Sequence, residues 1–191
     1  MTNFLIFGPP GSGKGTQSVR LASKFNLIHL STGDMLREEV AAQTELGKTV
    51  ESIMKRGELV PDEVVIQMIA ERLDANPDAK GFIFDGFPRT VDQARALDET
   101  LVEKGTSISK MLMLEVEQEE LVRRLLLRAE VAERPDDKDV DIIENRIKVY
   151  REKTEPVIAY YKNKGKYVPV NGMGGIEEIF SRLSEVVEDC I

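Results

Sequence analysis

A glycine-rich segment near the N-terminus constrains the fold more than any other feature of the sequence. It spans Gly8–Thr16 (GPPGSGKGT) and directly follows the apolar run Phe4–Phe7. Glycine lets a backbone turn tightly, so that successive N–H groups can converge on the oxygens of a phosphate. A helix that begins at the end of such a turn adds the positive end of its dipole. The segment therefore predicts a strand, a phosphate-binding turn and a helix, in that order.

Two side chains of this segment have the chemistry that a nucleoside triphosphate requires. The Lys14 ammonium can reach the β- and γ-phosphates, and the Thr16 hydroxyl can bind Mg²⁺. Gly15 stands between them, whereas the general motif has Ser or Thr directly after the lysine. The alternative is a turn that only joins a strand to a helix, which would need neither the lysine nor the glycine spacing. We expect a nucleotide-binding site here.

Four more short apolar runs have the length of strands, and segments with helical spacing lie between them. These runs are Leu27–Leu30, Phe82–Phe84, Met111–Val116 and Tyr167–Val170. Near-continuous apolar strands separated by helices predict an α/β fold with a mostly parallel sheet covered on both faces. The 191 residues suit one domain, closed by a helix at Ile176–Val187. The face of this helix that is expected to pack comprises Ile176, Ile179, Phe180 and Leu183.

The composition limits the partners of the chain. Its formal net charge of −8 argues against broad binding of nucleic acid or of anionic membranes. No apolar run approaches the roughly 18 residues that cross a bilayer. The only cysteine, Cys190, permits neither an intramolecular disulfide nor a cysteine zinc cluster, which fits a reducing cytoplasm. We therefore expect a cytoplasmic protein that holds anionic ligands with locally gathered Lys and Arg.

The segment Gly81–Thr90 (GFIFDGFPRT) predicts a second part of the site. Asp85 comes where the apolar run ends, and ligands of open α/β sheets bind at the carboxyl ends of strands. An acid there can organise Mg²⁺ through water, although it could equally cap a helix or a turn. Arg89 follows a Gly-Phe-Pro turn that would direct it toward the same crevice, with an exposed surface arginine as the alternative.

Together these motifs resemble those of the nucleoside monophosphate kinases. The matching parts are the glycine-rich segment with its intervening Gly15, Ser31–Arg37 (STGDMLR), Asp85–Gln93 (DGFPRTVDQ), Arg146 and Thr154–Ile158 (TEPVI). The resemblance covers nearly the whole chain. Within that family, the sequence is most similar to adenylate kinases of the short-lid type.

The resemblance implies a single domain with a five-stranded parallel sheet flanked by helices, the P-loop NTPase core. It also implies two mobile insertions, a helical AMP-binding region at residues 31–60 and a short lid over ATP at residues 128–138. Relatives with a longer lid can carry four zinc-binding cysteines. This chain has neither the length nor the cysteines, so we expect no structural zinc, and we expect a monomer.

The resemblance further implies roles for individual residues. Those expected to hold ATP are Gly11, Ser12, Gly13, Lys14, Gly15, Thr16, Arg128 and, through its backbone, Gly174. Those expected to hold AMP are Thr32, Arg37, Glu58, Leu59, Val60, Gly86, Phe87, Pro88, Arg89, Gln93, Arg134 and Arg146. The expected catalytic residues are Lys14, Arg89, Arg124, Arg128, Arg134 and Arg146. The expected contacts of Mg²⁺ are Thr16 and Asp85, the latter through water.

Arginines suit the implied reaction because its acceptor is a phosphate that is already ionised. No strong general base is needed, and the difficulty lies in joining two polyanions while charge spreads over the transferred group. Arginine stays charged and donates two parallel hydrogen bonds. Arg124 and Arg128 are four residues apart on the helix expected after Glu117, so they share a face. Without the other motifs, a solvated basic face would be the simpler interpretation. A closing lid would keep water from ATP.

Gln93 favours adenine as the acceptor base. Its carboxamide can donate to a ring nitrogen and accept from an amino group. Kinases specific for UMP and CMP typically have Asn-x-x-Asn and Ala-Gly-Asp where this chain has TVDQ and TGD. We therefore expect the reaction ATP + AMP = 2 ADP, with a UMP/CMP kinase as the alternative within the family. From other classes, a catalytically silent nucleotide-binding module stays open, whereas a GTPase would need Asn-Lys-x-Asp, and Asn163–Lys166 (NKGK) lacks the acid.

Overall fold

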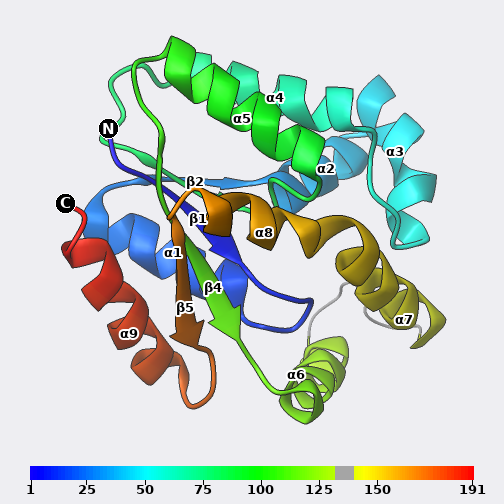
Figure 1. The fold of residues 1–191 in the computed structure, drawn as a ribbon. Coiled ribbons are helices and arrows are strands. Elements are labelled where there is room, and N and C mark those ends of the chain that lie inside the picture. The colour runs from blue at the N-terminus through cyan, green and yellow to red at the C-terminus, as the bar shows by residue number, and fades with distance from the viewer. Residues whose placement is uncertain (132–139) are drawn as a thin grey trace.

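The computed structural model describes residues 1–131 and 140–191 (Figure 1). Its strands form one parallel sheet in the order β2-β3-β1-β4-β5. The strands are β1 (Asn3–Phe7), β2 (Ile28–Ser31), β3 (Phe82–Asp85), β4 (Ile108–Glu115) and β5 (Tyr167–Asn171). The predicted five-stranded parallel α/β sheet is confirmed.

The largest difference from the predicted strands is the start of β4. This strand begins at Ile108 rather than at Met111, and the two residues between them, Ser109 and Lys110, are half-buried. Lys110 lies opposite Phe4 of β1 in the sheet. A search for continuous apolar runs overlooks such a segment, because backbone pairing extends beyond the residues that fill the core.

Helices cover both faces of the sheet. They are α1 (Lys14–Phe25), α2 (Thr32–Ala41), α3 (Glu45–Lys55), α4 (Asp62–Asp74), α5 (Val91–Glu103), α6 (Gln118–Val131), α7 (Val140–Val149), the π-helical turn η2 (Tyr150–Thr154), α8 (Pro156–Asn163) and α9 (Ile176–Glu188). α1 and α9 pack on one face, and α4, α5 and α8 on the other (Figure 1). None of the helices in the described ranges combines the length and the apolar character that crossing a bilayer requires.

The two cores follow from the alternation of side chains along each strand. In β1, Phe4 and Ile6 join the core under α1 and α9, whereas Leu5 and Phe7 join the opposite core. All five residues of β1 are buried, as expected for a central parallel strand. The predicted packing of α9 is wrong for Ile176, which is 55 % exposed, because this first residue of the helix borders a pocket instead of the sheet.

Residues 31–60 contain α2 and α3, which pack against each other (Figure 1). Thr44 caps α3, since its hydroxyl oxygen accepts a hydrogen bond from the Gly47 N–H at 2.9 Å. Gly47 lies so close to α2 that a Cβ there would come within 2.1 Å of the Glu39 carbonyl oxygen. The helical character of this region agrees with the sequence analysis, and its mobility stays a prediction.

The strand register brings three connections to one edge of the sheet. Asp85 at the end of β3 lies opposite Ser31 at the end of β2 and opposite Ile6 of β1. The glycine-rich loop after β1, the start of α2 and the turn after β3 therefore leave the sheet side by side. This arrangement places the main sequence motifs around a common opening.

Candidate active site

A pocket of about 900 Å³ opens at the carboxyl ends of β1, β2 and β3. Every site residue named by the sequence analysis borders it, except Arg134, which lies outside the described residues. Those that line it are Gly11, Ser12, Gly13, Lys14, Gly15, Thr16, Thr32, Arg37, Glu58, Leu59, Val60, Asp85, Gly86, Phe87, Pro88, Arg89, Gln93, Arg124, Arg128, Arg146 and Gly174. Most of the expected lid, residues 132–138, also lies outside the described residues.

The glycine-rich loop wraps around the N-terminus of α1. Gly11 and Gly13 have φ values of 87° and 90°, a region that side chains disfavour. At Gly11, a Cβ would also lie 2.9 Å from Cγ of Leu125 in α6 and 3.0 Å from the Leu121 carbonyl oxygen. The loop can therefore pack against α6 only with glycine at this position.

Lys14 lies inside this loop. Its Nζ donates hydrogen bonds to the carbonyl oxygens of Gly8 at 2.7 Å and Pro9 at 3.0 Å, and lies 3.4 Å from the Ser12 hydroxyl. Burial lowers the pKa of Lys14 to about 8, although the Asp85 carboxylate opposes the shift; nearby arginines add to it. The ammonium is therefore held by neutral carbonyls among other cations, which is a setting that an incoming phosphate would stabilise.

Asp85 faces the glycine-rich loop from the end of β3. Its side chain is largely buried, and Oδ2 would lie 3.5 Å from a Cβ at Gly15. On the other side, Nε2 of His29 in β2 is 3.5 Å from the same oxygen. Thr16, in the first turn of α1, borders the same pocket. A carboxylate and a hydroxyl at this position are oxygen donors of the kind that Mg²⁺ accepts in company with phosphates and water.

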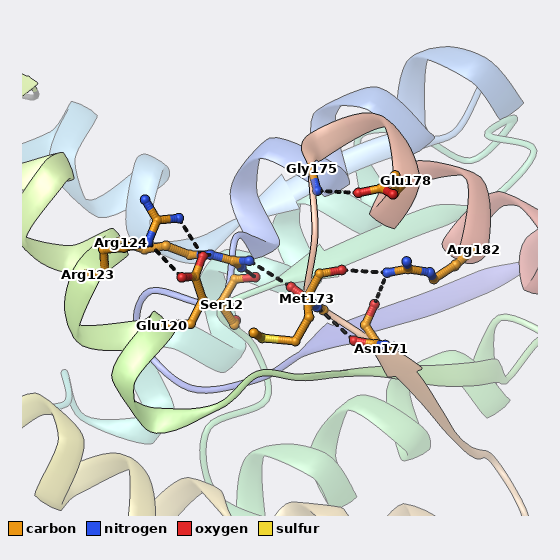
Figure 2. A network of polar contacts seen from close by, with 10 residues as sticks. Ser12, Glu120, Arg123, Arg124, Asn171, Met173, Gly175, Glu178 and Arg182 are labelled. Carbon is orange, nitrogen blue, oxygen red and sulfur yellow. Dashed lines mark hydrogen bonds and ion pairs between the residues drawn. The ribbon is translucent and has the colours of Figure 1, made fainter.

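Arg124 of α6 connects the glycine-rich loop to a second loop after β5 (Figure 2). Its Nη2 donates to the Gly172 carbonyl oxygen at 2.9 Å, and its Nη1 lies 3.4 Å from the Ser12 carbonyl oxygen. Its Nε donates to Glu120 at 2.7 Å. Hydrogen bonds from Arg123 and then from Arg124 lower the pKa of Glu120 to about 2. The guanidinium of Arg124 is thereby fixed at the pocket wall.

The loop of residues 171–175 is held by side chains on several sides (Figure 2). Nη1 of Arg182 donates to the carbonyl oxygens of Asn171 at 3.0 Å and Met173 at 2.6 Å. The Gly175 N–H donates to the Glu178 carboxylate at 2.7 Å. This loop contains Gly174, which was expected to meet the adenine of ATP through its backbone.

At the other end of the pocket, Thr32 and Arg89 converge on one carbonyl group. The Thr32 hydroxyl donates to the Gly86 carbonyl oxygen at 2.8 Å, and Nε of Arg89 donates to the same oxygen at 2.7 Å. Arg37 of α2 forms an ion pair with Asp34 and borders the same space. Arg89 thus lies beside the turn after β3 and Arg37 borders the same pocket, so that the two could bind an anion there.

Gln93 lies in the first turn of α5 and is only 2 % exposed. Its Oε1 accepts a hydrogen bond from the Arg89 backbone N–H at 2.7 Å, and its Nε2 donates to Oδ1 of Asp62 at 2.7 Å. Gln93 is the residue that the sequence predicts to bind the adenine of AMP. The structure adds that its carboxamide is held on two sides by the protein itself.

Four residues with polar contacts in or beside the site were missed as site residues: His29, Asp62, Glu120 and Arg182. Each contacts another site residue or loop rather than belonging to a motif. The contacts of His29, Asp62 and Arg182 join different secondary-structure elements, whereas Glu120 and Arg124 both lie on α6. His29 carried a signal as the only histidine of the chain, and it was interpreted as structural. Glu120 carried one in its spacing of four residues from Arg124 on the predicted helix, and this spacing was not used.

Comparison with known proteins agrees with this geometry. The family model for adenylate kinase matches residues 6–166. The adenylate kinase of Parabacteroides distasonis is 51% identical, over 99% of this chain and 99% of that protein. That of Flavobacterium psychrophilum is 49% identical over 99% and 100% of the two chains, and that of Phocaeicola vulgatus 48% over 98% and 99%. These matches cover nearly the whole chain, and the glycine-rich loop and the arginines around one pocket agree with them. The chain belongs to the adenylate kinase family.

Proposed function

We propose that the pocket binds ATP and AMP end to end and transfers the γ-phosphoryl group between them, giving two ADP. The observation that carries this proposal is the continuity of the pocket. One cavity includes the glycine-rich loop with Gly174 and Gly175 at one end, and Thr32, Arg37 and Gln93 at the other. Membership of the adenylate kinase family supports both the reaction and its substrates.

The donor end would hold ATP mainly through backbone groups. The N–H groups of the glycine-rich loop and the N-terminus of α1 would bind the phosphates, with Lys14 beside them. The loop of residues 171–175 would meet the adenine. Because Arg124 binds carbonyl oxygens of both loops, it would fix the distance between phosphate and base contacts.

Thr16 and Asp85 fit a magnesium ion that arrives with ATP. The described residues contain no cluster of three or more His, Cys, Asp or Glu that could hold a metal by itself. This agrees with Mg²⁺, which usually takes one or two protein oxygens and completes its shell with phosphates and water. When bound, such an ion supplies neutralisation of the charge that develops on the transferred group.

The acceptor end would hold AMP through side chains. Arg37 and Arg89 would bind its phosphate, Gln93 would bind its adenine, and Glu58–Val60 together with Thr32 would complete the walls. The phosphate of AMP is already ionised near neutral pH, so positioning and charge stabilisation are the main tasks of the protein. Arg124, Arg128 and Arg146 line the same pocket, and there they would stabilise the transferring phosphoryl group.

Exclusion of water is the remaining requirement. We propose that residues 31–60 and 128–138 move over the bound nucleotides as two insertions of a single domain, with Arg134 carried by the second. We also propose a cytoplasmic monomer that needs no structural zinc and binds neither nucleic acid nor membranes. The net charge of −8 supports the last two points, and light scattering after size exclusion would test the monomer.

A coupled assay of ADP formation tests the function directly. We expect activity with ATP and AMP, and a loss of about 10³-fold or more in kcat for Lys14→Ala and for Arg89→Ala, with the fold retained by circular dichroism. Initial rates with UMP and CMP test the alternative specificity within the family. If no nucleoside monophosphate gave ADP while ATP still bound, the chain would be a nucleotide-binding module without this activity.

A further inference from the structure

Asp62, in the first turn of α4, joins that helix to two residues at the start of α5. Its Oδ1 accepts a hydrogen bond from Nε2 of Gln93 at 2.7 Å, and its Oδ2 accepts one from the Thr90 hydroxyl at 2.9 Å. Thr90 is the N-cap of α5 and accepts from the Gln93 N–H at 3.1 Å. Gln93 lines the pocket, whereas Asp62 is not among the lining residues in the described chain. We therefore expect Asp62 to act on a ligand through Gln93.

The hydrogen-bonding capacity of Gln93 shows what remains for a ligand. A carboxamide has two N–H donors and two acceptor lone pairs. Asp62 occupies one donor, and the Arg89 backbone N–H occupies one lone pair. One donor and one acceptor are left, in a side chain that borders the pocket.

The two partners of Gln93 also decide which way its carboxamide points. A carboxylate only accepts hydrogen bonds, and a backbone N–H only donates them. In the reversed orientation, the oxygen of Gln93 would face the Asp62 carboxylate and its NH₂ group would face the Arg89 N–H. Both contacts would then be repulsive, and two buried polar groups would lose their partners. The orientation of the remaining donor and acceptor is therefore fixed.

This matters because adenine and 6-oxopurines differ in the order of donor and acceptor. Adenine has an amino donor at position 6 beside the acceptor N1, whereas a 6-oxopurine has an acceptor at position 6 beside a donor at N1. We propose that Asp62 is a positioning residue that holds the Gln93 carboxamide in the orientation that selects a 6-aminopurine over a 6-oxopurine. The inference rests on the proposed role of Gln93 at the AMP end of the pocket.

A purely structural role for Asp62 makes a different prediction. An acid in the first turn of a helix is favourable there, and the contact with Thr90 ties α4 to α5. Loss of these effects would lower the melting temperature without changing the preference between two purines. The test must therefore measure a ratio of substrates rather than activity alone.

The experiment measures kcat/KM for AMP and for IMP with ATP as donor, by coupled detection of ADP. These acceptors differ only at positions 1 and 6 of the base. We expect Asp62→Ala to lower the AMP/IMP ratio about tenfold, mainly through the KM of AMP, with the KM of ATP unchanged. Asp62→Asn keeps the shape but can both accept and donate, so it should lower the ratio about threefold. Glu63→Ala, which removes the other first-turn acid of α4, is the matched control and should leave the ratio unchanged.

A double-mutant comparison isolates the path through Gln93. In a Gln93→Ala background, adding Asp62→Ala should produce no further fall in the AMP/IMP ratio. An equal fall in both backgrounds, or no fall for Asp62→Ala and Asp62→Asn in the presence of Gln93, overturns the inference. If Gln93→Ala itself leaves the ratio unchanged, the AMP end of the proposed function is wrong and the inference falls with it. That result is distinguishable, because it appears without any change at Asp62.

Discussion

The two ends of the pocket prepare their binding groups in different ways. At the donor end the proposed binding groups are largely backbone, and Arg124 and Arg182 hold the carbonyl oxygens of the glycine-rich loop and of residues 171–175 (Figure 2). At the acceptor end they are side chains, and both Thr32 and Gln93 are buried and already hydrogen-bonded. A substitution cannot remove a backbone N–H or carbonyl group, whereas a single substitution can remove a side chain that binds the ligand.

This difference determines where each end is vulnerable. The donor end should lose affinity for ATP when a residue that sets the path of the backbone changes. Such a residue is an arginine that binds the loop carbonyl oxygens, or a glycine with positive φ. The acceptor end should fail when the reading side chain or its direct partner changes. In each case the KM of one nucleotide should rise while that of the other stays nearly constant, so each variant carries its own internal control.

The largest effect on this comparison is expected from Arg124→Ala. The change removes charged hydrogen bonds to two loops and a cation from the pocket wall. We expect kcat/KM for ATP to fall about 10²-fold, with a much smaller change in the KM of AMP. Steady-state kinetics with each nucleotide varied in turn measures this. Arg123→Ala is the matched control, since Arg123 also pairs with Glu120 but its side chain is 61% exposed. An equal loss of kcat/KM for ATP in this variant would contradict a specific role of Arg124 in joining the two loops.

Gly174→Ala should disturb the donor end by changing the path of the loop of residues 171–175. The φ of Gly174 is 103°, and a Cβ there would lie 2.5 Å from Oε2 of Glu178. Strain of about 2 kcal/mol corresponds to a rise of roughly 30-fold in the KM of ATP, with AMP unaffected. Gly165→Ala is the control, because Gly165 also has a positive φ but has open space around it. Equal effects of the two variants on the KM of ATP would show that general backbone strain, rather than the shape of this loop, is responsible.

At the acceptor end, Thr32→Val removes one hydroxyl with little change in shape. The Gly86 carbonyl oxygen would lose its bond from Thr32 but keep the one from Arg89. We expect the KM of AMP to rise about tenfold and the KM of ATP to stay within about twofold. Thr100→Val is matched to it, since Thr100 likewise donates to a carbonyl oxygen, that of Ala96. A rise in the KM of ATP as large as that of AMP would argue against separate ends.

The sequence predicted those parts of the fold and the site that depend on local pattern. The glycine-rich loop and Lys14 were recognisable because the spacing of the glycines and the lysine is sufficient to indicate a phosphate-binding loop. Asp85 could be named because it ends a buried strand, and Arg89 because it follows the Gly-Phe-Pro turn after that strand. The sheet could be predicted because its central strands are buried on both faces and are apolar throughout.

The parts that could not be predicted depend on contacts between elements. Asp62 and Gln93 are 31 residues apart and meet only because α4 packs on α5. In the sequence, nothing distinguishes Arg182 from other polar residues of α9. Its contact with the loop after β5 appears only in the folded chain. Ile176 fits the apolar face of α9, but it lies at the end of the helix, where the sheet no longer covers it. Helical spacing gives the direction of a side chain and not what lies opposite.

The smallest expected effect is a pH dependence confined to the donor end. Burial lowers the pKa of Lys14 to about 8. Below that pH the side chain is a cation that attracts phosphate, and above it the neutral amine does so less, so binding of ATP should weaken as the pH rises through 8. The fraction of ammonium falls about tenfold between pH 7 and 9, and we expect the Kd of ATP to rise about fivefold, since bound phosphate raises the pKa again.

Titration calorimetry is the suitable measurement for this effect, because the chain has no tryptophan to report binding by fluorescence. Lys14→Met should bind ATP weakly at both pH values and abolish the dependence. The Kd of AMP should change little over the same range, because the phosphate of AMP is fully ionised above pH 7 and its proposed arginine partners keep their charge. If AMP weakened as much as ATP, the charge lost would be shared by both ends, and the functional separation of donor from acceptor would be wrong.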